Sequence, residues 1–226
     1  MKLAIMLPSK GETKTRTVNC IIDTFVRLSK INVSFRLLFA EGTLVPHVRN
    51  KLIDAVIEDK DITHAIFIDS DMIFDPEWVI EMMKSENKVV TGVARCRGKK
   101  KINVFRYVRS AGLYKALEED EIVGEKEIPI DSVGMSFIMF TRDVIEKCIE
   151  YKQVIANYFK EQQVAVSSPS LKRICDTLGK DKGLFNSIGE KSEDIIFCEL
   201  IQDCNFKIVL NTKYKLGHIV EEELHI

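Results

Sequence analysis

Asp69 and Asp71 stand one residue apart, directly after the short apolar run 64–68. Such a run is typical of a strand covered on both faces of a sheet, and in open α/β sheets ligands bind beyond the carboxyl ends of the strands. Two acids placed there repel each other and lose hydration unless a cation or hydrogen-bond donors neutralise them. Carboxylates favour hard cations such as Mg²⁺ or Mn²⁺, which in turn bind diphosphate. The alternative is that both aspartates only cap a helix or fill a turn.

Arg49 precedes Ile53 and Ile57 by multiples of four residues, so it lies at the edge of the apolar face of a predicted helix. An arginine in that place could clamp a phosphate or orient an acidic site. A surface ion pair is the competing interpretation.

The sequence Ser192-Glu193-Asp194 opens an apolar helix. Ser192 suits the N-cap, and acids in a first turn suit the helix dipole, so a purely structural role is open. The functional interpretation is that one acid is a general base, kept ionised by the positive helix end.

Gly217-His218 lies near the C-terminus. A single histidine is more often structural than a ligand. Joined to two carboxylates, however, a neutral imidazole would tilt the metal preference toward Mn²⁺ over Mg²⁺.

Short apolar runs alternate with helical patterns in the first part of the chain, where they must position these residues. The pattern predicts strands over 2–7, 32–40, 64–68 and 89–93, and helices over 16–29, 44–58 and 76–83. This β-α-β-α-β-α-β series indicates a mostly parallel sheet with right-handed crossovers. Further along, we expect short strands within 101–118 and 128–140, a helix from Thr141, a helix over 192–204 and a strand over 206–210.

Composition narrows the class of protein. The chain has 226 residues, with 33 Lys+Arg against 34 Asp+Glu, and the absence of a basic excess argues against a nucleic-acid-binding protein. No segment reaches the roughly 20 apolar residues that span a bilayer, and no signal peptide is visible. The six scattered cysteines form no CxxC pair and are interpreted as thiols of a reducing cytoplasm. We therefore expect a cytoplasmic protein without a transmembrane segment.

Taken in order, these motifs resemble those of nucleotide-sugar glycosyltransferases of the GT-A fold, in particular compact inverting, family-2-like enzymes of bacteria and viruses with a DxD motif. The matching segments are 7–10, 48–50, 67–72, 91–93, 133–137, 192–194 and 217–218. The resemblance implies an α/β fold, with a Rossmann-like, mixed, mostly parallel sheet flanked by helices. It also implies one domain over 1–226, with a nucleotide-binding half (1–93) and an acceptor-side half (94–226).

The resemblance also implies roles for individual residues. The donor side comprises Pro8 and Lys10 beside the base and ribose, Arg49 near the nucleotide with Asn50 supporting it, Asp69 at the ribose or a metal-bound water, and Ser70. Asp71 would bind Mn²⁺ or Mg²⁺, with Asp69 and His218 completing the metal ligands. Asp194 would deprotonate the acceptor hydroxyl, with Glu193 as its neighbour or substitute. Residues 134–137, including Gly134 and Ser136, would line the acceptor side, although Ser136 replaces a glycine that many relatives carry.

The implied reaction transfers a sugar from a UDP- or GDP-sugar to a hydroxyl of a glycan, glycolipid or glycoprotein, with inversion. A sugar-phosphate nucleotidyltransferase is the alternative enzyme, but the segment 7–14 has one glycine where that class has a glycine-rich loop. A catalytically inert nucleotide-sugar or glycan-binding subunit is the alternative from another class. The polar segment 151–190 is a candidate lid over bound donor.

Overall fold

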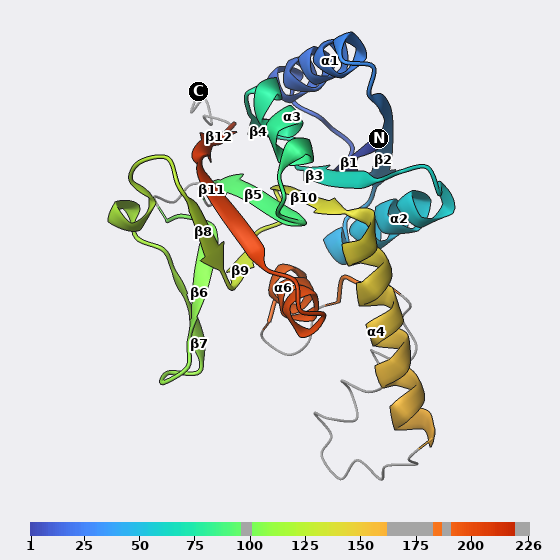
Figure 1. Ribbon diagram of the computed structural model, residues 1–226, viewed down its shortest axis with the longest axis vertical. Helices are drawn as coiled ribbons and strands as arrows, with labels where there is room; N and C mark the ends of the chain where they lie inside the picture. The colour runs from blue at the N-terminus through green and yellow to red at the C-terminus, as the bar shows by residue number, and fades with distance from the viewer. Residues whose placement is uncertain (96–100, 162–182, 187–190, 220–226) are drawn as a thin grey trace, which may run out of the picture.

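The computed structural model describes residues 1–95, 101–161, 183–186 and 191–219 (Figure 1). The first part of the chain alternates strands and helices: β1 (Lys2–Ser9), α1 (Thr15–Lys30), β2 (Ser34–Glu41), α2 (Val45–Glu58), β3 (His64–Ile68), β4 (Met72–Ile73), α3 (Pro76–Lys84) and β5 (Val89–Val93). The alternation predicted for this part is confirmed, and the strands over 64–68 and 89–93 match the prediction residue for residue.

The second part carries more strands than helices. Its elements are β6 (Val104–Val108), β7 (Leu113–Ala116), the 3₁₀ turn η1 (Glu119–Ile122), β8 (Glu127–Ile130), β9 (Ser132–Val133), β10 (Phe137–Thr141), α4 (Arg142–Glu161), α6 (Glu193–Asp203), β11 (Ile208–Lys215) and β12 (Gly217–His218). The β6–β7 hairpin projects from the main body beside α6 (Figure 1).

One seven-stranded sheet organises the molecule, in the order β2-β1-β3-β10-β5-β11-β8. Strands β2, β1, β3, β5 and β11 share one direction, whereas β10 and β8 run antiparallel to their neighbours. The predicted mixed, mostly parallel α/β sheet flanked by helices is therefore confirmed. The antiparallel β10 lies between β3 and β5, so residues of the second part of the chain reach the carboxyl end of β3.

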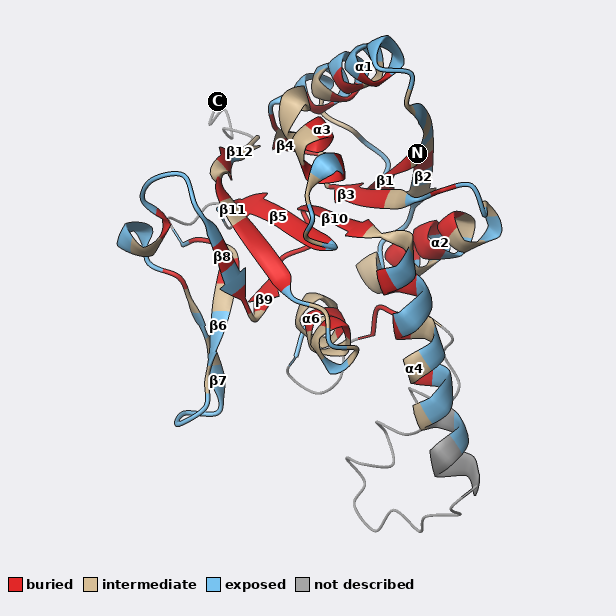
Figure 2. Ribbon diagram, viewed as in Figure 1, coloured by how far each residue is buried: buried red, intermediate tan, exposed pale blue. Residues whose placement is uncertain are grey.

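Helices cover both faces of this sheet (Figures 1 and 2). On β1, Leu3, Ile5 and Leu7 face a core shared with α1 and α3, whereas Ala4 and Met6 face a core shared with α2, α4 and α6. This alternation explains the continuous apolar runs, because a strand covered on both faces must be apolar at every position. Within the described part of the chain, no helix combines the length and hydrophobicity needed to cross a bilayer.

Local sequence sets the boundaries of several helices. Asp75 caps α3, since its carboxylate accepts a hydrogen bond from the Glu77 N–H at 2.9 Å, and Pro76 follows in the first turn. Asn205, after α6, has φ of 64°, the left-handed conformation expected of an asparagine that ends a helix.

Two features differ from the sequence-based prediction. Strand β11 runs to Lys215 rather than to residue 210, because the polar Thr212 is held in the sheet by hydrogen bonds with Lys126 and Gly124. The two-residue strands β4 and β12 form a separate ribbon that pairs Met72 with His218. No local pattern signals such a short ribbon, since it depends on two segments far apart in the chain.

Candidate functional site

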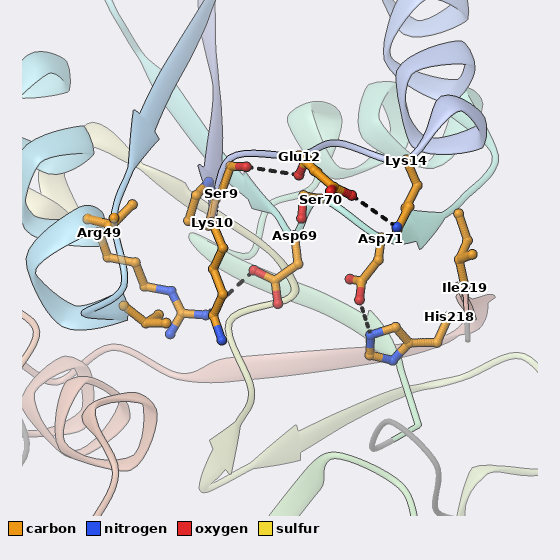
Figure 3. A pocket seen from close by; sticks show the side chains of 14 residues that line it. Ser9, Lys10, Glu12, Lys14, Arg49, Asp69, Ser70, Asp71, His218 and Ile219 are labelled. Carbon is orange, nitrogen blue, oxygen red and sulfur yellow. Dashed lines mark hydrogen bonds and ion pairs between the residues drawn. The ribbon is translucent and has the colours of Figure 1, made fainter. Parts of the chain in front are cut away.

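A cavity of about 670 Å³ opens where β1 and β3 end. Seven residues singled out from the sequence line it: Pro8, Lys10, Arg49, Asp69, Ser70, Asp71 and His218. The remaining lining residues are Ser9, Glu12, Lys14, Gly42, Val45, Val48 and Ile219. Figure 3 shows carboxylates and cationic side chains directed into the same space.

The segment after β1 forms one wall of the cavity. Ser9 Oγ accepts a hydrogen bond from the Gly11 N–H at 3.0 Å and donates to the Glu12 carbonyl at 2.9 Å. The Lys14 N–H donates to the Ser70 carbonyl at 2.9 Å, which ties this segment to the loop after β3. Sequence reasoning missed Lys14, although its position shortly after a predicted strand end was an available signal.

The loop that carries Asp69 and Asp71 is held from both sides. The Asp69 N–H donates to the Ser136 carbonyl at 2.9 Å, and the Ile219 N–H donates to the Asp71 carbonyl at 2.9 Å. Burial raises the pKa of the Asp69 carboxyl and the nearby Asp71 adds to the rise, whereas the Arg49 guanidinium opposes it. The two acids therefore share a site in which added positive charge is stabilising.

His218 reaches this loop through the β4–β12 ribbon. Its Nε2 lies 3.2 Å from Asp71 Oδ2, and its Nδ1 lies 3.0 Å from the Arg95 carbonyl oxygen. The Arg95 carbonyl can accept only from a proton on Nδ1, so Nε2 is the ring nitrogen that faces Asp71.

Arg49 joins the cavity to the start of α6. Its Nη1 donates to Asp194 Oδ1 and, at 3.1 Å, to Glu193 Oε1, and its Nη2 lies 3.6 Å from Asp69 Oδ1. The Arg49 side chain is 5% exposed, so its ion pairs are not those of a surface residue. Three carboxylates thus gather around one buried cation.

Asp194 lies in the first turn of α6, and its Oδ2 is 3.4 Å from the Met135 N–H. Burial raises the pKa of Asp194 to about 6, and Glu193 and Asp69 add to the rise while Arg49 opposes it. The sequence had suggested that the helix end alone would keep this acid ionised. Loss of hydration thus opposes ionisation, but with a pKa of about 6 the carboxyl is still mostly ionised at neutral pH. Ser192 occupies the N-cap as predicted, but its side chain makes no capping hydrogen bond.

Other predicted residues lie outside the lining of the cavity. Asn50 accepts from the Phe185 N–H at 2.8 Å and donates to the Phe185 carbonyl at 2.9 Å, so its amide anchors segment 183–186. A side chain at Gly134 would displace Asn103, because an added Cβ would lie 1.8 Å from Asn103 Nδ2. Ser136 meets the site through its backbone carbonyl, and Glu193 and Asp194 meet it through Arg49. Most of the candidate lid, 162–182 and 187–190, lies outside the described residues.

Several solved structures are similar to this chain. A197 from STIV is similar with a TM-score of 0.57 and 18% identity, covering 98% of this chain and 87% of that one. GalNAc-T7, solved with UDP, GalNAc and Mn²⁺, is similar with a TM-score of 0.49 and 9% identity. That match spans 99% of this chain but 44% of GalNAc-T7. A glycosyltransferase involved in glycosylation of the major capsid of PBCV-1 is similar with a TM-score of 0.35 and 10% identity. That match covers 92% of this chain and 91% of the other. No protein-family model and no curated protein matches the chain. At these identities the first likeness shows the fold alone, and the other two are too weak to support an inference.

Proposed function

We propose that this chain is a metal-dependent glycosyltransferase of the GT-A type, which moves a sugar from a UDP- or GDP-sugar to a hydroxyl acceptor with inversion. One observation carries the proposal: the cavity at the ends of β1 and β3 brings the Asp69–Asp71 pair, His218 and the cation Lys10 together, and Arg49 links it to Asp194. On this proposal, residues 1–93 form the nucleotide-binding half and residues 94–226 the acceptor-side half.

The donor set fits a divalent cation. Asp71 offers a carboxylate, and His218 offers Nε2 while its Nδ1 is satisfied by the Arg95 carbonyl, as is usual for histidine ligands. The described residues contain no cluster of three or more His, Cys, Asp or Glu side chains arranged to hold a metal. We therefore keep Asp71 and His218 as the proposed protein ligands and assign Asp69, which the resemblance made a third ligand, to the ribose. Water and diphosphate oxygens would occupy the remaining positions, which suits Mg²⁺ or Mn²⁺. When bound, the ion would neutralise the departing diphosphate as a Lewis acid.

The protein's own groups would divide the remaining work. Pro8 and Lys10 would lie against the base and ribose, and Asp69 and Ser70 would contact the ribose side of the donor. Asp194 would accept the proton of the attacking hydroxyl as that oxygen forms its bond to the anomeric carbon. A pKa near 6 suits this role, because the carboxylate is ionised at neutral pH yet remains basic enough to take a proton.

Thermal melting against UDP, GDP and their sugars tests the donor site, with Mn²⁺, with Mg²⁺ and with EDTA. A ligand that binds the folded state raises the melting temperature, so we expect a rise with one nucleoside diphosphate that EDTA abolishes. Release of nucleoside diphosphate from the matching sugar then tests turnover. Pyrophosphate release from a nucleoside triphosphate and a sugar phosphate would indicate the nucleotidyltransferase instead. Binding without turnover would indicate an inert subunit, and no melting shift would remove the roles given to Asp69, Asp71 and His218.

A further inference from the structure

The Arg49 guanidinium is enclosed by aromatic rings. Its central carbon lies 5.8 Å from the centroid of the Phe67 ring on β3 and 5.7 Å from that of Phe185. Phe185 is fully buried, and its backbone is pinned by both hydrogen bonds to Asn50, the next residue after Arg49. The two rings therefore limit how the planar guanidinium can rotate and how far it can move toward the cavity.

The polar contacts of Arg49 are directed at acids. The shortest contacts go from Nη1 to Asp194 and Glu193, whereas Asp69 on the donor side lies 3.6 Å from Nη2. Nε is buried and has no hydrogen-bond partner among the described residues, so it is not presented to a ligand at the cavity surface. These contacts are those expected of a group that orients carboxylates, not of one that binds a nucleotide.

Within the described part of the chain, the hydrogen bond given for Asp194 besides that of Arg49 is a long one. The Ser192 side chain does not cap α6, and the Met135 N–H is at the long distance of 3.4 Å from Asp194 Oδ2. Resting on the proposed function, we propose that Arg49 is a positioning residue. It holds the Asp194 carboxylate against the acceptor hydroxyl and couples that carboxylate to Asp69 on the donor side.

The experiment compares donor binding with turnover in variants of the full chain. Arg49→Ala removes the guanidinium group. Arg49→Lys keeps the charge but cannot bridge several carboxylates with a rigid planar group. Arg142→Ala is the matched control, because Arg142 is a largely buried arginine that donates to the Val56, Ile57, Asp59 and Ile62 carbonyls. Calorimetry with UDP and Mn²⁺ gives the affinity, nucleoside diphosphate release from UDP- and GDP-sugars gives turnover, and added methylguanidinium tests chemical rescue.

We expect both Arg49 variants to lose about 10–100-fold in turnover, the range typical for removal of a hydrogen-bond partner that orients a metal ligand. Affinity for UDP and Mn²⁺ should change less than about threefold, and methylguanidinium should restore part of the turnover of Arg49→Ala. Arg142→Ala should melt at a lower temperature without any rescue of turnover. If Arg49→Ala fails to fold, Arg49→Lys decides by the same comparison of affinity with turnover.

Weakened UDP affinity with unchanged turnover would overturn the positioning role and make Arg49 a nucleotide contact. Unchanged turnover in Arg49→Lys together with absent rescue of Arg49→Ala would also overturn it. Wild-type protein that releases no nucleoside diphosphate from any of the sugars would instead overturn the proposed function, and this inference with it.

Discussion

The carboxylate of Asp71 lies 3.2 Å from Nε2 of His218, and the two residues come from distant parts of the chain. The β4–β12 ribbon pairs their segments, and the Arg95 carbonyl at 3.0 Å from Nδ1 orients the imidazole. The pair is the point at which the proposed metal dependence can be tested most directly.

Asp71→Ala should abolish metal-dependent binding of UDP, because the charge of the diphosphate would no longer be compensated through a bound cation. Calorimetry with UDP and Mn²⁺ measures this loss. Asp75→Ala is the control, since it removes the cap of α3, costs about 1 kcal/mol of stability and leaves the cavity intact. Equal UDP affinity in wild type and Asp71→Ala would show that the metal site is wrongly assigned.

Asp194→Asn should keep UDP affinity and lose most transfer, since a general base acts only at the chemical step. In the wild type, turnover should fall as the pH drops through about 6, because burial raises the pKa of Asp194 to about 6 and protonation removes the base. A pH series of turnover at saturating donor measures both effects. An Asn variant with wild-type turnover would exclude Asp194 from the mechanism.

Ionised Asp194, which is partly buried, should lower the free energy of unfolding at neutral pH. Its pKa in the folded protein is raised above the ordinary 3.8, so the folded state binds the proton more tightly than the unfolded state. The free energy of unfolding should therefore fall as the pH rises from about 4 to about 6. For a pKa raised by about two units, the fall is on the order of 2–3 kcal/mol. Urea unfolding should show Asp194→Asn to be more stable than wild type at pH 8 and equal to it near pH 4. Asp23→Asn, at an exposed position on α1, is the control for the substitution itself.

Asn50→Ala should destabilise the protein by about 1–3 kcal/mol, because the backbone N–H and carbonyl of buried Phe185 would both lose their partner. Urea unfolding measures the loss, and Asn19→Ala on the exposed side of α1 is the control. If both variants unfold at the same urea concentration as wild type, the Asn50 amide does not anchor segment 183–186.

Gly134→Ala should displace Asp194, the proposed general base, indirectly. The new Cβ would lie 1.8 Å from Asn103 Nδ2, so one of the two must move, and Met135, whose N–H faces Asp194, is the next residue. We expect about a tenfold loss of turnover from this misplacement, with UDP affinity retained. Adding Asn103→Ala removes the obstructing atoms and should restore turnover. A double variant as impaired as Gly134→Ala alone would point to another cause.

Local sequence determined the elements of the first part of the chain. Apolar runs identified β3 and β5 residue for residue, and helical spacing identified α1 and α2, because each element alone must bury a face against the sheet. Pro76 indicated the start of α3. The placement of Asp69 and Asp71 at the end of a buried strand followed from the same pattern. Burial along the edge strand β2 did not follow from the sequence: Phe39 is 59% exposed although it lies on the same face as the partly buried Phe35 and Leu37.

Tertiary structure alone decided which distant residues meet. The insertion of antiparallel β10 between β3 and β5, and the β4–β12 ribbon that carries His218 to Asp71, depend on pairing between segments far apart in sequence. The same holds for the Arg49 contacts with Glu193 and Asp194 and for the raised pKa of Asp194, since burial comes from the packed whole and not from the helix that carries the residue. The sequence by itself determined which side chains could do the chemistry, and only the fold, by removing them from water together, decided how their charges are shared.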